Sequence, residues 1–140
     1  MTIGLLSSLR TARLELISNA IDNDADEYDT GNLLIYSGTR PSTGDPIDEY
    51  ENVELVNFSL PYPCGSIYGN ILTFSAVDTV LGLEDGIASW ARIVDANGDF
   101  VMDLSVTDQA GNGDIKLSSL VIVKDSEIYV VSAALTEGNP

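Results

Sequence analysis

The sequence predicts a mainly β protein: an antiparallel β-sandwich, Greek-key or jelly-roll-like, preceded by one N-terminal α-helix. Apolar residues recur at helical spacing only near the N-terminus. From Leu33 onward, short runs of β-branched and aromatic residues alternate with Gly, Pro, Asn and Asp. A length of 140 residues is enough for one well-packed domain. We therefore expect a helix and acidic connection over residues 1–31 and a β-sandwich over residues 32–137, within a single domain.

The predicted helix extends from about Leu5 to Ile21. Ser7 and Ser8 are candidate N-cap residues. Its apolar positions form one stripe, widened by two isoleucines: Leu5, Leu9, Ala12, Leu16 and Ala20, with Ile17 and Ile21. We expect the β-domain or a partner chain to bury this stripe. The acidic run 22–32 then ends the helix.

Seven strands are predicted from the apolar runs and the turn residues between them. They lie near residues 33–37, 53–60, 71–77, 87–94, 100–106, 116–123 and 127–135. The longest interruption, residues 38–52, contains two prolines and several acids and is predicted to be a surface loop or flexible arm.

The segment "GIASWARIVDANGDFVMDLSV" predicts a hairpin with Asn97-Gly98 at its tip, since Asn-Gly favours a type I′ turn. A two-residue loop would pair Ile93 with Met102, whereas a three-residue loop would reverse that parity. The even register places six apolar side chains on one face: Ile87, Ala91, Ile93, Phe100, Met102 and Leu104.

On the opposite face of this hairpin, Trp90 and Arg92 lie near Asp103. One interpretation is a structural cluster, with the guanidinium over the indole and a cross-strand ion pair. The other is an interface anchor, since Trp and Arg are enriched at binding hot spots. The candidate interaction residues are thus Leu5, Leu9, Leu16, Arg40, Trp90 and Arg92.

Composition argues against several classes of function. Against 22 Asp and Glu stand six Lys and Arg, giving a net charge of −16, which repels nucleic-acid phosphates and anionic lipid head groups. The chain has no His, so Ser–His and Cys–His nucleophile pairs and imidazole metal sites are absent. The single Cys64 is expected to be a buried or half-buried, unreactive thiol. We expect neither an enzyme nor a bound cofactor.

Two acidic turns raise the question of calcium binding. The sets Asp22, Asp24, Asp26 and Asp95, Asn97, Asp99 have suggestive spacing, but neither segment has the Gly and Glu that an EF-hand loop requires. We expect solvated turns, and loose calcium coordination stays an alternative.

Several segments together resemble a family of small β-rich structural proteins of tailed phages and prophages. They are "LLIYSGTRPSTGDP", the hairpin segment above and "DIKLSSLVIVKDSEIYVVSAALTEGNP". The shared pattern includes Tyr36, Gly38, Pro41, Trp90, Arg92 and Asp95. The acidity and the segments "IDNDADEYDTGN" and "DEYENVEL" depart from it.

The resemblance implies a virion component without enzymatic activity, assembled in the host cytoplasm. We expect a capsid decoration (cement) protein bound to the outer shell, with phage capsid or other virion proteins as partners and self-association, but no nucleic acid or membrane. The alternatives are a tail, baseplate or head–tail connector component, and a carbohydrate- or calcium-binding attachment module.

Overall fold

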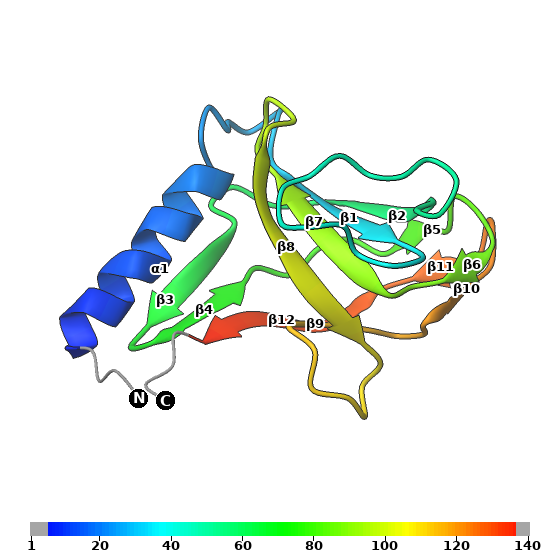
Figure 1. Ribbon diagram of the computed structural model, residues 1–140. Coiled ribbons are helices and arrows are strands. Elements are labelled where there is room, and N and C mark those ends of the chain that lie inside the picture. Colours follow the sequence, from blue (N-terminus) through cyan, green and yellow to red (C-terminus); the bar gives the residue numbers. More distant parts are fainter. Residues whose placement is uncertain (1–5, 137–140) are drawn as a thin grey trace.

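The computed structural model describes residues 6–136 and shows a mainly β fold with one N-terminal helix (Figure 1). Leu5 and the end of the predicted domain at residue 137 lie outside the described residues. Helix α1 spans Ser7–Ile21. Its N-cap is Leu6, which provides no side-chain hydrogen bond, so neither Ser7 nor Ser8 caps the helix as predicted.

Twelve strands follow within the described residues, and eight of them form one sheet. Their bounds are β1 Asn32–Tyr36, β2 Glu54–Ser59, β3 Gly65–Tyr68, β4 Ile71–Phe74, β5 Val80–Leu81, β6 Gly86–Ile87, β7 Trp90–Val94, β8 Phe100–Thr107, β9 Ile115–Leu117, β10 Val121–Ile122, β11 Glu127–Ile128 and β12 Val130–Thr136.

The large sheet has the order β2-β1-β7-β8-β9-β12-β4-β3 and curls so that its two halves face each other, which is the sandwich-like packing predicted. Its ladders are antiparallel except for the parallel pair β8–β9. Two short ribbons, β6–β10 and β5–β11, extend the structure at one end (Figure 1).

The predicted strands correspond to observed ones, but three are interrupted. The runs 87–94, 116–123 and 127–135 each divide into two strands, because the chain leaves the large sheet to form the ribbons. Strands β3 and β5 were not predicted. β3 follows a Pro-rich stretch and lies at the edge of the sheet, and its side chains alternate between half-buried and exposed.

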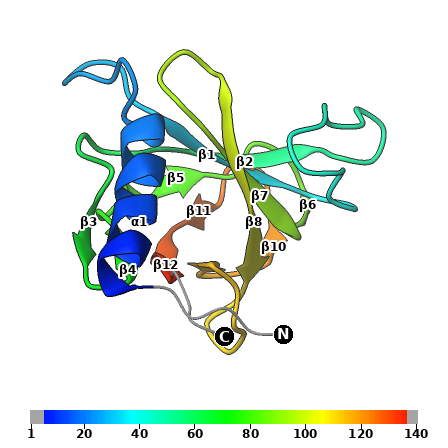
Figure 2. The same cartoon turned by 60° about the vertical axis from the view of Figure 1, so that its left-hand side comes forward.

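One hydrophobic core joins the helix to the sheet. Leu14 and Ile21 of α1 are buried in the same cluster as Leu33, Ile93 and Ile115. The helix contacts β3, β4 and β8 and so covers the side of the curled sheet between β8 and the β3–β4 edge (Figure 2).

Polar contacts fix the same helix to the β3–β4 hairpin. The Thr11 hydroxyl donates to the Gly69 carbonyl at 2.7 Å. The backbone N–H of Cys64 donates to both carboxylate oxygens of Asp22, each at 3.1 Å. Among residues 6–136, no helix combines the length and the apolar character needed to cross a bilayer.

Candidate interaction surfaces and the Arg92 cluster

The β7–β8 hairpin has the predicted register along most of its length. Ala91 pairs with Leu104 and Ile93 with Met102, while Arg92 lies opposite Asp103 on the other face. The prediction that Trp90 and Ile93 occupy opposite faces is confirmed by this register.

The turn that joins the two strands differs from the predicted two-residue turn. Asp95 donates its backbone N–H to the Asp99 carbonyl, which leaves three residues in the loop. Gly98 has φ 84°, but Asn97 does not have a positive φ, so the predicted type I′ turn is wrong. A bulge between Ile93 and Val94, with Val101 as the extra residue on β8, corrects the parity.

Two predictions about the apolar face are wrong, the first because of the bulge and the second because Ile87 lies outside β7. Val94 pairs with Phe100, so Phe100 lies on the face of Arg92 and not on that of Met102. Ile87 is not part of β7: it belongs to the ribbon β6–β10 and is 64% exposed.

Arg92 is the centre of a buried polar cluster. Its Nε donates to Asp103 Oδ1 at 2.7 Å and its Nη2 donates to Asp103 Oδ2 at 3.2 Å. The guanidinium lies over two rings, 5.2 Å from the Trp90 centroid and 5.1 Å from that of Phe100. Tyr36 stacks on Trp90 with centroids 4.8 Å apart.

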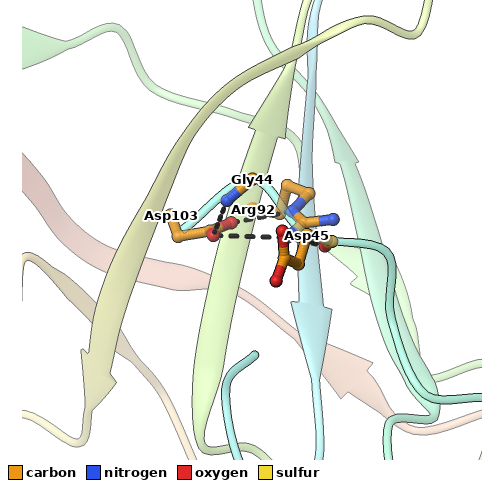
Figure 3. A network of polar contacts seen from close by, with 4 residues as sticks. All are labelled: Gly44, Asp45, Arg92 and Asp103. Carbon is orange, nitrogen blue, oxygen red and sulfur yellow. Dashed lines mark hydrogen bonds and ion pairs between the residues drawn. The ribbon is translucent and has the colours of Figure 1, made fainter. Parts of the chain in front are cut away.

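The Arg92–Asp103 ion pair also holds the predicted arm, residues 38–52, against the sheet (Figure 3). Arg92 Nη2 donates to the Asp45 carbonyl at 2.8 Å, and the Gly44 N–H donates to Asp103 Oδ2 at 3.2 Å. One ion pair therefore connects two strands and a long loop.

Asn52, which sequence reasoning missed, holds the base of the arm. It is 3% exposed, and its amide donates to the carbonyls of Ser37 and Thr39 at 3.0 and 2.9 Å. Its Oδ1 accepts the Asp48 N–H at 3.0 Å. An Asn within an acidic, loop-like run gives no sequence signal that separates a buried residue from a solvated one.

Trp90 is 2% exposed, and Arg92, which contacts the arm, is 9% exposed. A partner does not reach them while the arm is in place, so the geometry favours their structural interpretation. Within the described residues, the buried Trp90 Nε1 has no hydrogen-bond partner. Arg40 is exposed on the arm, whereas the ion pair and hydrogen bonds of the cluster are made by Arg92, Asp103, Gly44 and Asp45.

The β-domain buries only part of the predicted stripe, since Ile17 and Ile21 pack against the core. Leu14 and Ile21 face the core, while Leu9 and Leu16 are 52% and 70% exposed. The β-domain therefore does not bury these two leucines. With Leu6, which is 67% exposed, they form what we call the helix surface: Leu6, Leu9 and Leu16.

A second group of exposed aliphatic side chains lies on the ribbons and is called the ribbon surface. It consists of Leu81, Leu83, Ile87, Val121 and Val123. Val121 and Ile87 are cross-strand partners. The ribbons meet where Gly82 bridges Lys124; a Cβ at Gly82 would lie 2.5 Å from the Val123 carbonyl oxygen, so glycine permits this close approach.

The two acidic turns lie beside each other. Asn97 Nδ2 donates to Asp24 Oδ2 at 2.8 Å and Asn23 Nδ2 donates to Asp95 Oδ2 at 3.5 Å. Asp95 Oδ1 also accepts the N–H groups of Asn97 and Asp99. In the part of the chain that the structure describes, no three acidic or Cys side chains are grouped so as to hold a metal ion.

Cys64 is buried, as the sequence predicts. Burial raises the pKa of its thiol from 9.0 to about 11, and the nearby Asp22 carboxylate adds to the increase. A contact of 3.6 Å joins its sulfur to the Ser18 hydroxyl. At neutral pH the thiol is protonated, so its role is to pack beneath α1.

Comparison with known proteins adds no further assignment, since no family model, curated protein or solved structure matches this chain.

Proposed function

We propose that this protein is a non-enzymatic structural component of a tailed-phage virion, and that it decorates the outer surface of the capsid shell. The observation that carries the proposal is the pair of exposed aliphatic surfaces. Helix α1, which carries the helix surface, and the two ribbons, which carry the ribbon surface, lie at opposite ends of the molecule in Figure 1. Side chains of this size gathered on a surface are typical of protein contact sites.

Two surfaces at opposite ends suit a protein that bridges neighbours. Helix α1 contacts β3, β4 and β8, whereas the ribbons are built from β5, β6, β10 and β11. A subunit with this arrangement contacts one shell protein, or a second copy of itself, at each end. Several weak contacts around a symmetric shell then act together through multivalency.

The charge of the protein supports apolar attachment. A net charge of −16 opposes self-association, and charge attraction to a basic surface is screened beyond roughly 8 Å at physiological ionic strength. The aliphatic side chains supply contacts that salt does not weaken. The resemblance of the sequence to phage structural proteins favours the same conclusion.

The test is occupancy of the protein on phage particles after washing in high salt. We expect occupancy to survive, and we expect Leu9→Asp and Ile87→Asp each to lower it, because each places a charge in an apolar contact. Tyr28→Asp is the matched control, since Tyr28 is 89% exposed and lies outside both surfaces.

Each variant is first shown to fold by circular dichroism. Antibody-labelled particles in electron micrographs then distinguish label on the shell from label on the tail. Release by salt alone, with both variants binding normally, would exclude attachment through these surfaces. Label confined to the tail would place the protein among the tail or baseplate components.

A further inference from the structure

One pair of neighbouring segments is joined at both ends and open between them. Thr73 of β4 pairs with Ala134 of β12, and Val80 of β5 pairs with Ile128 of β11. Residues 73–81 and 127–134 therefore run antiparallel along their length. Between the two paired ends, residues 74–79 and 129–133 form no ladder with each other. We call this opening the window.

A cavity of about 320 Å³ lies at the window. Its margins are residues 73–77 and 130–134, and its floor consists of buried core side chains: Leu33, Leu60, Ile93 and Ile115. None of the described residues that line it carries a charge. The window thus gives access through the wall of the sheet to an apolar floor.

Hydrogen bonds to other parts of the fold hold one margin away from β12. The Ser75 N–H donates to the Cys64 carbonyl at 2.8 Å, and the Ser75 hydroxyl donates to the Pro63 carbonyl at 3.4 Å. These contacts draw the chain after β4 toward the segment that leads into β3.

The other margin is held from the opposite direction. Val130 and Ala133 pair with β9, and Tyr129 exchanges hydrogen bonds with Ser118 at 3.0 and 3.2 Å. Closing the window would break contacts on both sides, so it is part of the folded structure. Its margins also carry small side chains that leave the space open: Ser75, Ala76, Ser132, Ala133 and Ala134.

We infer that the window is a binding site for a small, neutral, mainly apolar molecule. The cavity volume is near the lower end of the range for small-molecule pockets, about 300 Å³. The apolar floor matches an alkyl chain or a small ring, while the Ser132 hydroxyl on one margin offers a contact to one polar group at the mouth.

The electrostatics decide against an anion. Among residues 6–136, no cation lines the cavity to receive a carboxylate or phosphate, and the net charge of −16 repels anions from the whole surface. A neutral alcohol is therefore a better ligand than the fatty acid of the same length. This inference does not depend on a virion function.

The experiment compares 1-hexanol with hexanoate, which have the same number of carbon atoms but differ in charge. Backbone amide shifts of the full chain are followed by NMR during titration. We expect saturable shifts with hexanol at residues 73–77 and 130–134, and binding of hexanoate weaker by at least about tenfold.

Substitution identifies the site. Ala133 pairs with the buried Ile115, so Ala133→Leu places a larger side chain on the cavity-facing side of β12, and we expect it to abolish hexanol binding. Ala110→Leu, in an exposed loop, is the matched control and should bind as the unaltered protein does. If Ala133→Leu does not fold, Ala76→Leu fills the window from the opposite margin.

Three results would overturn the inference. They are the absence of saturable hexanol binding, shifts that map away from the window, and binding unchanged in whichever filling variant folds. Hexanoate binding as tight as hexanol would overturn the assignment to neutral ligands.

Discussion

Strand β7 and helix α1 differ in how they are covered. β7 has the core on its Ile93 face and the 38–52 arm on its Arg92 face, and both side chains are buried. Helix α1 buries Leu14 and Ile21 and leaves Leu9 and Leu16 exposed. Large apolar residues of β7 therefore have a structural role, whereas those on the outer face of α1 are available for contacts with other molecules.

The difference has a geometric cause. A strand in a ladder has only two faces, and pairing with its neighbours determines which residues share each face. A helix can rotate about its axis, so its orientation depends on which side chains best fit the surface below. Here the β3, β4 and β8 surface accepts Leu14, Ile17 and Ile21.

We expect the largest change in the free energy of unfolding from a substitution in β7, which is covered on both faces. Arg92→Ala leaves the Asp103 carboxylate, whose side chain is 0% exposed, without its ion-pair partner, and releases the arm. We expect a loss of about 3–5 kcal/mol in the free energy of unfolding, measured in urea. Arg40→Ala, on the exposed part of the arm, should change it by less than about 0.5 kcal/mol. Equal small effects would show that the two cations are equally dispensable and that β7 is not held by this pair.

A second measurement compares the two faces of α1. Leu14→Ala should lower the free energy of unfolding by about 2–5 kcal/mol, because Leu14 is 1% exposed within the core. Leu9→Ala should lower it by no more than about 0.5 kcal/mol. The same urea titrations provide both values. A reversed order would mean that the helix lies on the sheet through its Leu9 face.

The smallest effect concerns the place where α1 meets β3. Because the pKa of Cys64 is raised from 9.0 to about 11 in the folded protein, the protonated thiol favours folding. This contribution is complete below pH 9.0 and is lost as pH rises through about 11, at most about 2.7 kcal/mol in total.

Unfolding in urea at several pH values checks this expectation, with Cys64→Ala as the reference. The variant should lose stability less steeply over that interval than the unaltered protein. Tyr36, whose pKa burial also raises, contributes equally to both proteins and cancels in the comparison. Parallel pH profiles would show that the thiol is not the titrating group.

The sequence was sufficient for features that local pattern determines. The helix and most strands follow from periodicity and turn residues, whereas the predicted pairing of Ile93 with Met102 is reached through a three-residue loop and a bulge that the sequence pattern does not predict. It was insufficient where distant segments decide the outcome. The burial of Asn52, the orientation of α1 and the division of residues 116–123 into β9 and β10 each depend on contacts far away in the chain.

The Arg92 cluster shows the same division between local features, which the sequence predicts, and contacts between distant segments, which it does not. The Arg92–Asp103 pair could be predicted, because it is a cross-strand pair in a short hairpin. The arm that covers it could not, since Gly44 and Asp45 are more than forty residues away from the strands they contact. The ribbon surface was also missed, because its residues occur in runs that are otherwise typical of buried strands.

The bulge at Val101 has a consequence for how this hairpin can change in length. The three-residue loop and the extra residue each reverse the alternation of side chains, and together they restore it. Deleting one loop residue alone would shift the register so that Arg92 no longer lies opposite Asp103. Deleting one loop residue together with Val101 would keep the two residues paired. Related chains should therefore gain or lose residues here in even numbers, with the two positions changing as a unit.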